Sequence, residues 1–253
     1  MQHLQAWLPR IEAFNADFRR KIGPGKLGLF KLVAFLLAAP RLLAAALMGR
    51  SSSFRPGEFQ WPWVPRWPGL AAIPIHAGSE HPWTERILAA RHDIANEMAG
   101  VEAAFARARY DSELNSKQWN TYYFYLQGKP VDHHLAACPR TAAILRTLPH
   151  NSLHVCFSAI QPGRSLHPHT GPTNASLTAH LGLRNCAGAM LWVGDRSAAY
   201  RDGEVLVFDD SFVHWVENAG AATRYTLMIT FWHPDLSWPE RVFLGLVLRM
   251  GKA

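Results

Sequence analysis

Two histidines and one arginine have the types and the placement expected of a metal site with an acidic cosubstrate. His169 and His214 are far apart in the sequence, and Arg224 follows on the next apolar run. Each lies in or beside a short stretch of apolar, β-branched or aromatic residues, which is typical of a strand. Two imidazoles can bind a transition metal and leave several coordination positions open. We interpret the pair as a non-haem iron site between two facing strands.

The third ligand of the usual non-haem iron site is missing next to His169. A carboxylate commonly stands two positions after the first histidine, but this position is Gly171. Glycine cannot ligate, and its missing side chain would leave a coordination position for water or an anion. Asp209 and Asp210 could offer a carboxylate, although a turn role and a role behind the metal ligands are favoured. Because the chain has 13 histidines, the pair alone is a weak signal.

The elements that would position these residues are short strands in the second half of the chain. Turn residues such as Gly194-Asp195 and Asp202-Gly203 separate apolar runs there. Strands are expected at 153–160, 177–184, 189–193, 204–209, 212–217 and 224–232. Several short strands at this spacing predict a sandwich or barrel, of which the jelly roll is one solution.

Arg224 begins the last of these strands. It shares one face with Thr226, Met228 and Thr230, because side chains alternate along a strand. A buried arginine needs an anion, which an acidic cosubstrate would supply. The alternative is an internal ion pair with one of the two neighbouring aspartates.

The first half of the chain predicts helices around a lead-in rich in proline and tryptophan. Helices are expected at 2–22, within 27–48, over 83–106 as one or two helices, at 139–148 and at 242–250, with a strand at 119–126. His133-His134 is interpreted as a polar loop pair, and His167 as an entrance or surface residue. These patterns divide the chain into a helical region (1–50), a lead-in (51–82) and a β domain with supporting helices (83–253).

Residues 27–48 are nearly all apolar and approach the roughly 20 residues of a spanning helix. Lys31, Pro40 and Arg41 argue against a simple span. An interfacial membrane helix pair is favoured over helices packed on the domain and over a true span. Five flanking basic residues predict the cytoplasmic face of an anionic membrane: Arg19, Arg20, Lys21, Lys26 and Arg50. We therefore expect a cytoplasmic protein that is peripheral on the membrane.

The composition fits a globular protein with an anionic partner. Hydrophobic residues make up 49% and charged residues 18% of the 253 residues, and the net charge is +7. Nucleic acid is not expected, because no run interleaves basic and aromatic residues as a stacking groove does. Three cysteines without paired spacing indicate a reducing compartment.

Several motifs, in order and at matching spacing, resemble the aspartyl/asparaginyl β-hydroxylase family. They are His169-Thr170-Gly171-Pro172-Thr173-Asn174, His180-Leu181-Gly182-Leu183, Asp202-Gly203-Glu204, Phe208-Asp209-Asp210-Ser211-Phe212-Val213-His214 and Trp232-His233-Pro234. The resemblance implies a mainly β protein with flanking helices and a double-stranded β-helix (jelly-roll, cupin-like) core. It also implies an iron(II) and 2-oxoglutarate dependent dioxygenase that uses O2. This family binds iron with two histidines only, so the glycine at position 171 is expected.

The resemblance also implies a role for each matching residue. His169 and His214 would bind the iron. Arg224 would pair with the distal carboxylate of 2-oxoglutarate, with help from Ser158. His180 would contact the cosubstrate near the metal, and Trp119 would wall its pocket.

The substrate is less clear from the resemblance. Animal members carry arginines for substrate recognition where this chain has Ser176 and Thr178, so a peptidyl aspartate substrate is in doubt. A small molecule, a peptide or a lipid remains open. The membrane-like N-terminal region is similar to that of lipid A acyl-chain hydroxylases, which are His-x-Asp enzymes. A halogenase and a non-catalytic jelly roll that binds a metal or a metabolite are further alternatives.

Overall fold

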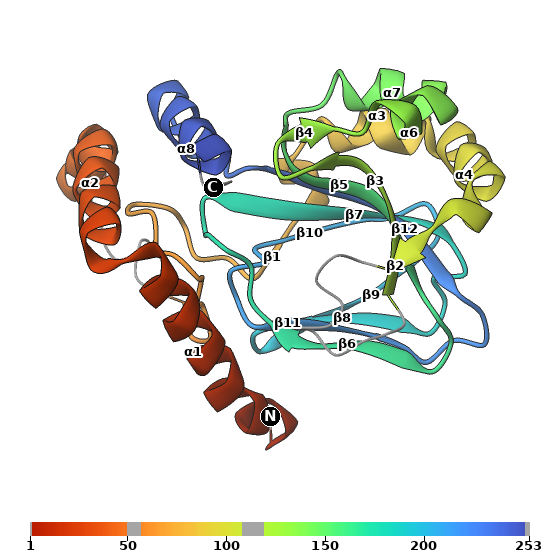
Figure 1. Ribbon diagram of the computed structural model, residues 1–253, viewed down its shortest axis with the longest axis horizontal. Helices are drawn as coiled ribbons and strands as arrows, with labels where there is room; N and C mark the ends of the chain where they lie inside the picture. The colour runs from red at the N-terminus through yellow and green to blue at the C-terminus, as the bar shows by residue number, and fades with distance from the viewer. Residues whose placement is uncertain (1, 50–56, 108–118, 251–253) are drawn as a thin grey trace.

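The computed structural model describes residues 2–49, 57–107 and 119–250, and within them two antiparallel sheets face each other (Figure 1). The larger sheet runs in the order β1-β10-β7-β12-β5-β3-β2, with β4 beside β3, and the smaller sheet in the order β6-β11-β8-β9. The larger sheet contains β1 (Ile75–His76), β2 (Ala106–Arg107), β3 (Trp119–Leu126), β4 (Lys129–Pro130), β5 (His150–Ile160), β7 (Ser176–Arg184), β10 (Val205–Phe208) and β12 (Arg224–Trp232). The smaller sheet contains β6 (Arg164–His169), β8 (Ala189–Val193), β9 (Arg196–Ala199) and β11 (His214–Asn218). The predicted jelly-roll class is confirmed.

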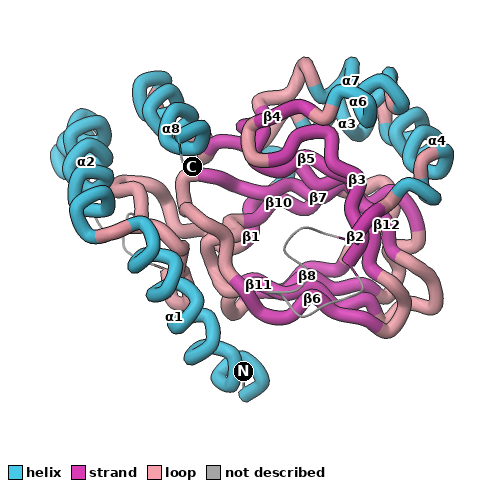
Figure 2. The backbone as a smooth tube through the Cα atoms, in the orientation of Figure 1, coloured by secondary structure: helices cyan, strands magenta, loops and turns pink. Residues whose placement is uncertain are grey.

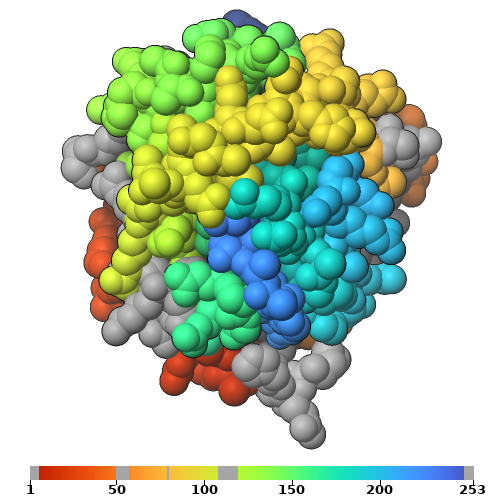
Figure 3. Space-filling view, turned by 90° about the vertical axis from the view of Figure 1, so that its right-hand side faces the viewer, coloured from red at the N-terminus to blue at the C-terminus, as the bar shows by residue number. Residues whose placement is uncertain are grey.

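Four short helices cover the outer face of the larger sheet (Figure 1), and their segment, coloured yellow to green, forms the upper part of the surface in Figure 3. They are α3 (Thr84–Ala89), α4 (Arg91–Gly100), α6 (Asp132–Ala137) and α7 (Pro139–Leu145). Their buried side chains, such as Ile94 and Met98, share one apolar core with Phe157, Leu227 and Ile229 of the sheet. The helix expected at 83–106 is thus two helices, followed by the short η3 (Glu102–Ala104).

The alternation along β12 decides what faces the other sheet. Leu227 and Ile229 point into the helix-covered core, whereas Arg224 and Met228 line a cavity between the sheets. This is the arrangement expected from the strand's period of two. The apolar core under the helices therefore fixes the orientation of the arginine.

The two-residue strands β1, β2 and β4 were not predicted, and neither were β6, β9 and helix α6. β6 contains Pro168 and polar residues and lies at the edge of the smaller sheet, where a proline is tolerated. β9 (Arg-Ser-Ala-Ala) lacks the β-branched and aromatic residues that mark a strand. The interpretation of His133-His134 as a loop pair was wrong, because both belong to α6. His134 bonds through Nδ1 to the Tyr123 carbonyl at 2.7 Å, and its ring stacks on Tyr122.

The N-terminal helices α1 (Gln2–Ile22) and α2 (Pro24–Leu47) lie beside the sheets with the C-terminal helix α8 (Trp238–Met250) (Figure 2). The helices expected at 2–22, 27–48 and 242–250 are all present. α1 is fastened to the lead-in, because Asn15 donates a hydrogen bond to the Trp61 carbonyl at 2.8 Å. The lead-in also enters the larger sheet through β1, which pairs with β10. The division into three segments stays a prediction.

A buried ion pair joins α2 to α8. Arg41 makes two hydrogen bonds of 2.7 Å to the carboxylate of Glu240, which is fully buried and also accepts from Trp67 Nε1 at 2.8 Å. Burial opposes the ionisation of Glu240, but the bonds from Arg41, Trp67 and Ser237 outweigh it and lower the pKa to about 2. Arg41 is therefore an internal cation and is not available to a membrane surface.

Candidate active site

The two candidate metal ligands meet on the smaller sheet. His169 ends β6 and His214 begins β11, and the two residues are direct partners across the strand pair. Their ring centroids lie 4.1 Å apart. The antiparallel pairing of β6 with β11 therefore brings together two imidazoles that are far apart in the sequence.

Backbone carbonyls set the tautomer of both imidazoles. His169 Nδ1 lies 2.7 Å from the carbonyl oxygen of His167, and His214 Nδ1 lies 2.9 Å from that of Phe212. A carbonyl only accepts, so Nδ1 carries the proton in each ring and the lone pair remains on Nε2. Metal-binding histidines commonly have this second hydrogen bond, which also holds the ring in place.

Burial keeps the two rings neutral. It lowers the pKa of His169 to about 4 and the pKa of His214 well below its usual value, and the nearby His169 lowers the latter further. A protonated imidazole cannot bind a metal, whereas a neutral one can. Both residues are thus ready to act as ligands near pH 7.

Arg224 lies on the larger sheet, on the opposite side of the cavity. Its side chain is fully buried, and one guanidinium nitrogen lies 3.4 Å from Ser158 Oγ. The guanidinium carbon lies 4.6 Å from the centre of the Tyr200 ring. Nε and the other terminal nitrogen have no hydrogen-bond partner within the part of the chain that the structure describes. A buried guanidinium with free N–H groups is a site for an anion.

The alternative that Arg224 pairs with a neighbouring aspartate is not borne out. Asp209 accepts hydrogen bonds from Gln60 Nε2 and from the backbone and hydroxyl of Ser211, and so holds the turn before β11. Asp210 accepts one from Thr178 Oγ1 at 3.1 Å. Over the described ranges, neither carboxylate forms an ion pair with the guanidinium.

Trp119, Ser158 and His180 complete the wall around Arg224. Trp119 Nε1 donates to Ser158 Oγ at 3.0 Å, and all three residues line the same cavity. His180 Nδ1 bonds to the Tyr200 hydroxyl at 2.7 Å, while its Nε2 has no partner among the residues described. Burial and the charge of Arg224 lower the pKa of His180 well below its usual value. The structure thus places all six predicted site residues around one cavity.

Tyr200 was not predicted as a site residue. It follows β9, a strand that the sequence did not indicate, and it contacts both Arg224 and His180. Burial raises its pKa to about 12, so the phenol stays protonated at neutral pH. Its position after Arg196–Ala199 gives no local signal of these contacts.

The sequence suggested that the space beside Gly171 would be open to water or an anion. In the structure this space is occupied by Asp210. A Cβ atom at this position would lie 2.4 Å from Asp210 Oδ1. The missing side chain therefore makes room for a carboxyl group from another segment. Burial, and then the charge of Asp209, raise the pKa of Asp210 to about 8. Its Oδ1 has no hydrogen-bond partner in the described residues, and the residue lines the cavity.

The cavity has a volume of about 410 Å³ and is bounded by both sheets and by α1. Helix α1 contributes Trp7 and Phe14, and the lead-in contributes Trp63. The Trp7 ring stacks on His167 with centroids 4.7 Å apart, so His167 is a cavity residue. This space is large enough for a small dicarboxylate together with part of a substrate.

The cavity residues fit a metal and an acidic cosubstrate. Two neutral imidazoles with their proton on Nδ1 are suitable metal donors. The unpartnered N–H groups of Arg224 and the Ser158 hydroxyl are suitable donors to a carboxylate. The two groups lie on opposing sheets, so a ligand could reach from one to the other.

The family model for aspartyl/asparaginyl beta-hydroxylase matches residues 88–234, and the chain belongs to this family. Human aspartate beta-hydroxylase domain-containing protein 2 is 35% identical over 145 residues, which are 54% of this chain and 39% of that protein. Human aspartyl/asparaginyl beta-hydroxylase is 31% identical over 137 residues, 52% of this chain and 18% of that protein. The chain thus spans less than half the length of these relatives.

Solved structures with a similar fold include a Pseudomonas putida prolyl-4-hydroxylase. Its TM-score is 0.39 at 16% identity, over 58% of this chain and 88% of the other.

Proposed function

We propose that the protein is an iron(II) and 2-oxoglutarate dependent dioxygenase that hydroxylates an unactivated C–H bond and converts 2-oxoglutarate to succinate. One observation carries the proposal: two neutral imidazoles face a buried arginine with unpartnered N–H groups across a single cavity. Membership of the hydroxylase family supports it.

His169 and His214 would hold the iron through Nε2. The backbone carbonyls of His167 and Phe212 keep the proton on Nδ1 and fix both rings. When bound, the iron supplies the activation of O2 that side chains cannot perform. Asp210 stands beside Gly171, where it can accept a hydrogen bond from water close to the metal site.

Arg224 would bind the distal carboxylate of 2-oxoglutarate. Ser158 adds a hydroxyl, and Trp119 holds that hydroxyl by donating to it. The ring of Tyr200 packs against the Arg224 guanidinium. The hydrogen bond between the Tyr200 hydroxyl and His180 Nδ1 orients the imidazole so that its Nε2 would be free for the cosubstrate. The buried wall also excludes water from the reacting atoms.

The substrate class follows from what surrounds the rest of the cavity. Thr178 lines the cavity, but its hydroxyl donates a hydrogen bond to Asp210. Ser176 accepts a hydrogen bond from Asn151. Neither residue supplies a cation for an acidic side chain, whereas the exposed Arg10 of α1 also lines the cavity, with its guanidinium over the Trp7 ring. Trp7, Phe14 and Trp63 give the cavity an aromatic wall, which favours a substrate with an apolar part, whether a small molecule, a peptide or a lipid.

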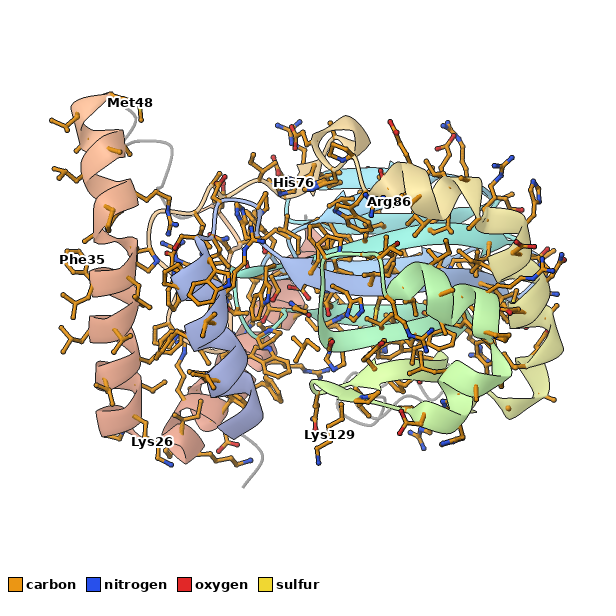
Figure 4. All side chains as sticks on the ribbon, turned by 90° about the horizontal axis from the view of Figure 1, so that it is seen from above. Lys26, Phe35, Met48, His76, Arg86 and Lys129 are labelled. Carbon is orange, nitrogen blue, oxygen red and sulfur yellow. The ribbon has the colours of Figure 1, made fainter. Side chains whose placement is uncertain are left out.

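A location at the cytoplasmic surface of a membrane is part of the proposal. α2 is 24 residues long and contains an 18-residue window of mean hydropathy 1.9, so it is long and apolar enough to cross a membrane, and only 17% of that window is buried. Its outward face exposes Leu32, Phe35 and Leu36 by 56–61%, and Figure 4 shows Phe35 on the side of α2 that points away from the sheets. An exposed apolar surface of this kind marks an interaction site. The exposed Lys26 at the start of the helix favours an anionic surface.

The test is succinate formation from 2-oxoglutarate by purified protein with iron(II) and ascorbate. His169→Ala should abolish turnover and weaken the binding of Co²⁺, an iron(II) substitute whose absorption reports its coordination. The matched control is His167→Ala, which removes a neighbouring cavity imidazole but keeps the carbonyl that orients His169. Unchanged turnover in His169→Ala would show that the metal assignment is wrong.

A further inference from the structure

Another group of side chains of types that can bind a metal lies at the edge of the larger sheet. One nitrogen each of His76 and His81 and a carboxylate oxygen of Glu80 lie within 4.8 Å of one another. None of the three residues lines the cavity between the sheets. His76 is on β1, which pairs with β10. In Figure 4 it lies near Arg86 of α3.

The two imidazoles are buried and have unused nitrogen atoms. His76 is 8% and His81 is 3% exposed, and Nε2 of each has no hydrogen-bond partner among the described residues. A polar atom buried without a partner costs free energy, so a native structure has a reason for it. Two such atoms from adjacent imidazoles indicate a common ligand that accepts lone pairs.

The backbone holds these donors in place without a ligand. The short η2 (Gly78–Glu80) places Glu80 one turn after His76, and Glu80 Oε2 lies 3.2 Å from His76 Nδ1. The Thr84 hydroxyl donates a hydrogen bond to the carbonyl of His81 at 2.8 Å. The His81 ring packs edge-on against Phe231. Burial lowers the pKa of both imidazoles. The neutral form, which can donate a nitrogen lone pair to a metal, is therefore favoured at pH 7.

We propose that His76, Glu80 and His81 bind one Zn²⁺ ion, or a divalent cation of similar softness. Two imidazoles and one carboxylate, with water in the fourth position, are the donor set of an open zinc site. The ion ties the loop after β1 to the sheet edge. Glu80 is about half exposed at its side chain, so an ion can enter from solvent.

The site can be tested independently of the proposed iron site. The double variant His169→Ala/His214→Ala removes the candidate iron ligands and serves as the background. After equilibrium dialysis against Zn²⁺ alone, mass spectrometry of the metal should find one zinc ion per background chain. Adding Glu80→Gln or His81→Gln should weaken zinc binding by about tenfold or more, whereas the exposed His92→Gln should not change it.

Glu80→Gln is the more informative variant, because its half-exposed side chain is not required for packing. Zn²⁺ should raise the Tm of the background protein, because a ligand that binds the native state stabilises it. That rise should disappear with Glu80→Gln. A background protein that binds no zinc would overturn the proposal, as would equal zinc affinity with and without Glu80→Gln.

Discussion

The chemistry of the candidate site depends on single hydrogen bonds at single atoms. Nδ1 of His169 and of His214 each face a backbone carbonyl two residues earlier. The same local geometry therefore presents Nε2 of both rings. On the opposite sheet, Arg224 contacts Ser158 of that sheet and Tyr200, which follows β9 of the smaller sheet, and part of its guanidinium stays unpaired among the described residues. These pairings leave two imidazole nitrogens on one side of the cavity and unpaired guanidinium N–H groups on the other.

Arg224→Met should weaken 2-oxoglutarate binding specifically. Removing one partner of a buried charge pair costs about 2 kcal/mol or more, so we expect the KM for 2-oxoglutarate to rise by about thirtyfold or more. The measurement is succinate formation over a range of 2-oxoglutarate concentrations. Arg201→Met is the matched control, because Arg201 is exposed and contacts Glu204. An unchanged KM in Arg224→Met would contradict the cosubstrate assignment.

Asp210→Asn should change how the stability of the metal-free protein depends on pH. The folded pKa of about 8 lies above the ordinary value of 3.8, so the folded state binds more protons between these values. Stability contributed by the protonated form is therefore lost as pH rises from about 4 to 8. The variant lacks this loss. Its free energy of unfolding, relative to that of the parent protein, should therefore rise by at most about 1.4 kcal/mol for each pH unit between about 4 and 8.

Urea unfolding of both proteins in chelator at pH 5 and pH 8 measures this difference. The buried histidines are common to both proteins, so their contributions cancel. An advantage of Asp210→Asn that is equal at both pH values would refute the raised pKa.

The residues of the site could be named from the sequence where a motif contained them. His169, His214 and Arg224 are examples, and the structure places them around one cavity. Asp210 was named too, but its position in the space beside Gly171 depends on the approach of two separate segments. Tyr200 had no motif and no strand signal. The metal and cosubstrate roles of all these residues stay predictions.

At the level of elements, the sequence identified strands with strong alternation and failed at the edges. β3 and β12 were expected at their observed bounds, because each is rich in aromatic or β-branched residues. β6 was missed although it carries His169, since its polar residues and Pro168 conceal its period. Pairing with β11 makes it a strand, and pairing between distant segments is not visible in a local pattern.

Breaking the ion pair between α2 and α8 on one side should destabilise the fold strongly. Arg41→Met leaves the buried Glu240 carboxylate without its cation, and breaking such a pair costs about 3–5 kcal/mol. Arg41→Met/Glu240→Gln should recover part of that loss, because the uncompensated charge is gone. Urea unfolding of the two single variants and the double variant measures the coupling. Additive losses would show that the two side chains do not stabilise each other.

For the whole molecule, one side holds the candidate site and the other is apolar and exposed. α2 packs its buried Ala34 in one cluster with Trp67 and Leu244, and exposes larger side chains on its far face. α1 connects the two parts, because Trp7 and Phe14 line the cavity. The sequence predicted both helices but not their packing, which depends on the lead-in and α8.

The outward face of α2 should bind anionic vesicles. Replacing Leu32, Phe35 and Leu36 with glutamine removes exposed apolar area, so we expect the partition coefficient to fall by at least about tenfold. Vesicle co-sedimentation at two salt concentrations measures it. Ile73→Gln, an exposed residue of the lead-in, is the control and should bind as the parent does. Equal binding by the triple variant would rule out this face.

The inward pair of Arg41 and Glu240 has a practical consequence for protein engineering. A chain from which residues 1–50 are removed would lose Arg41, the cation that neutralises Glu240. It would also lose Trp7 and with it part of the cavity wall. Any chimera that transplants the β domain must therefore carry both amino-terminal helices with it, or replace Glu240 by a neutral residue and rebuild the missing wall.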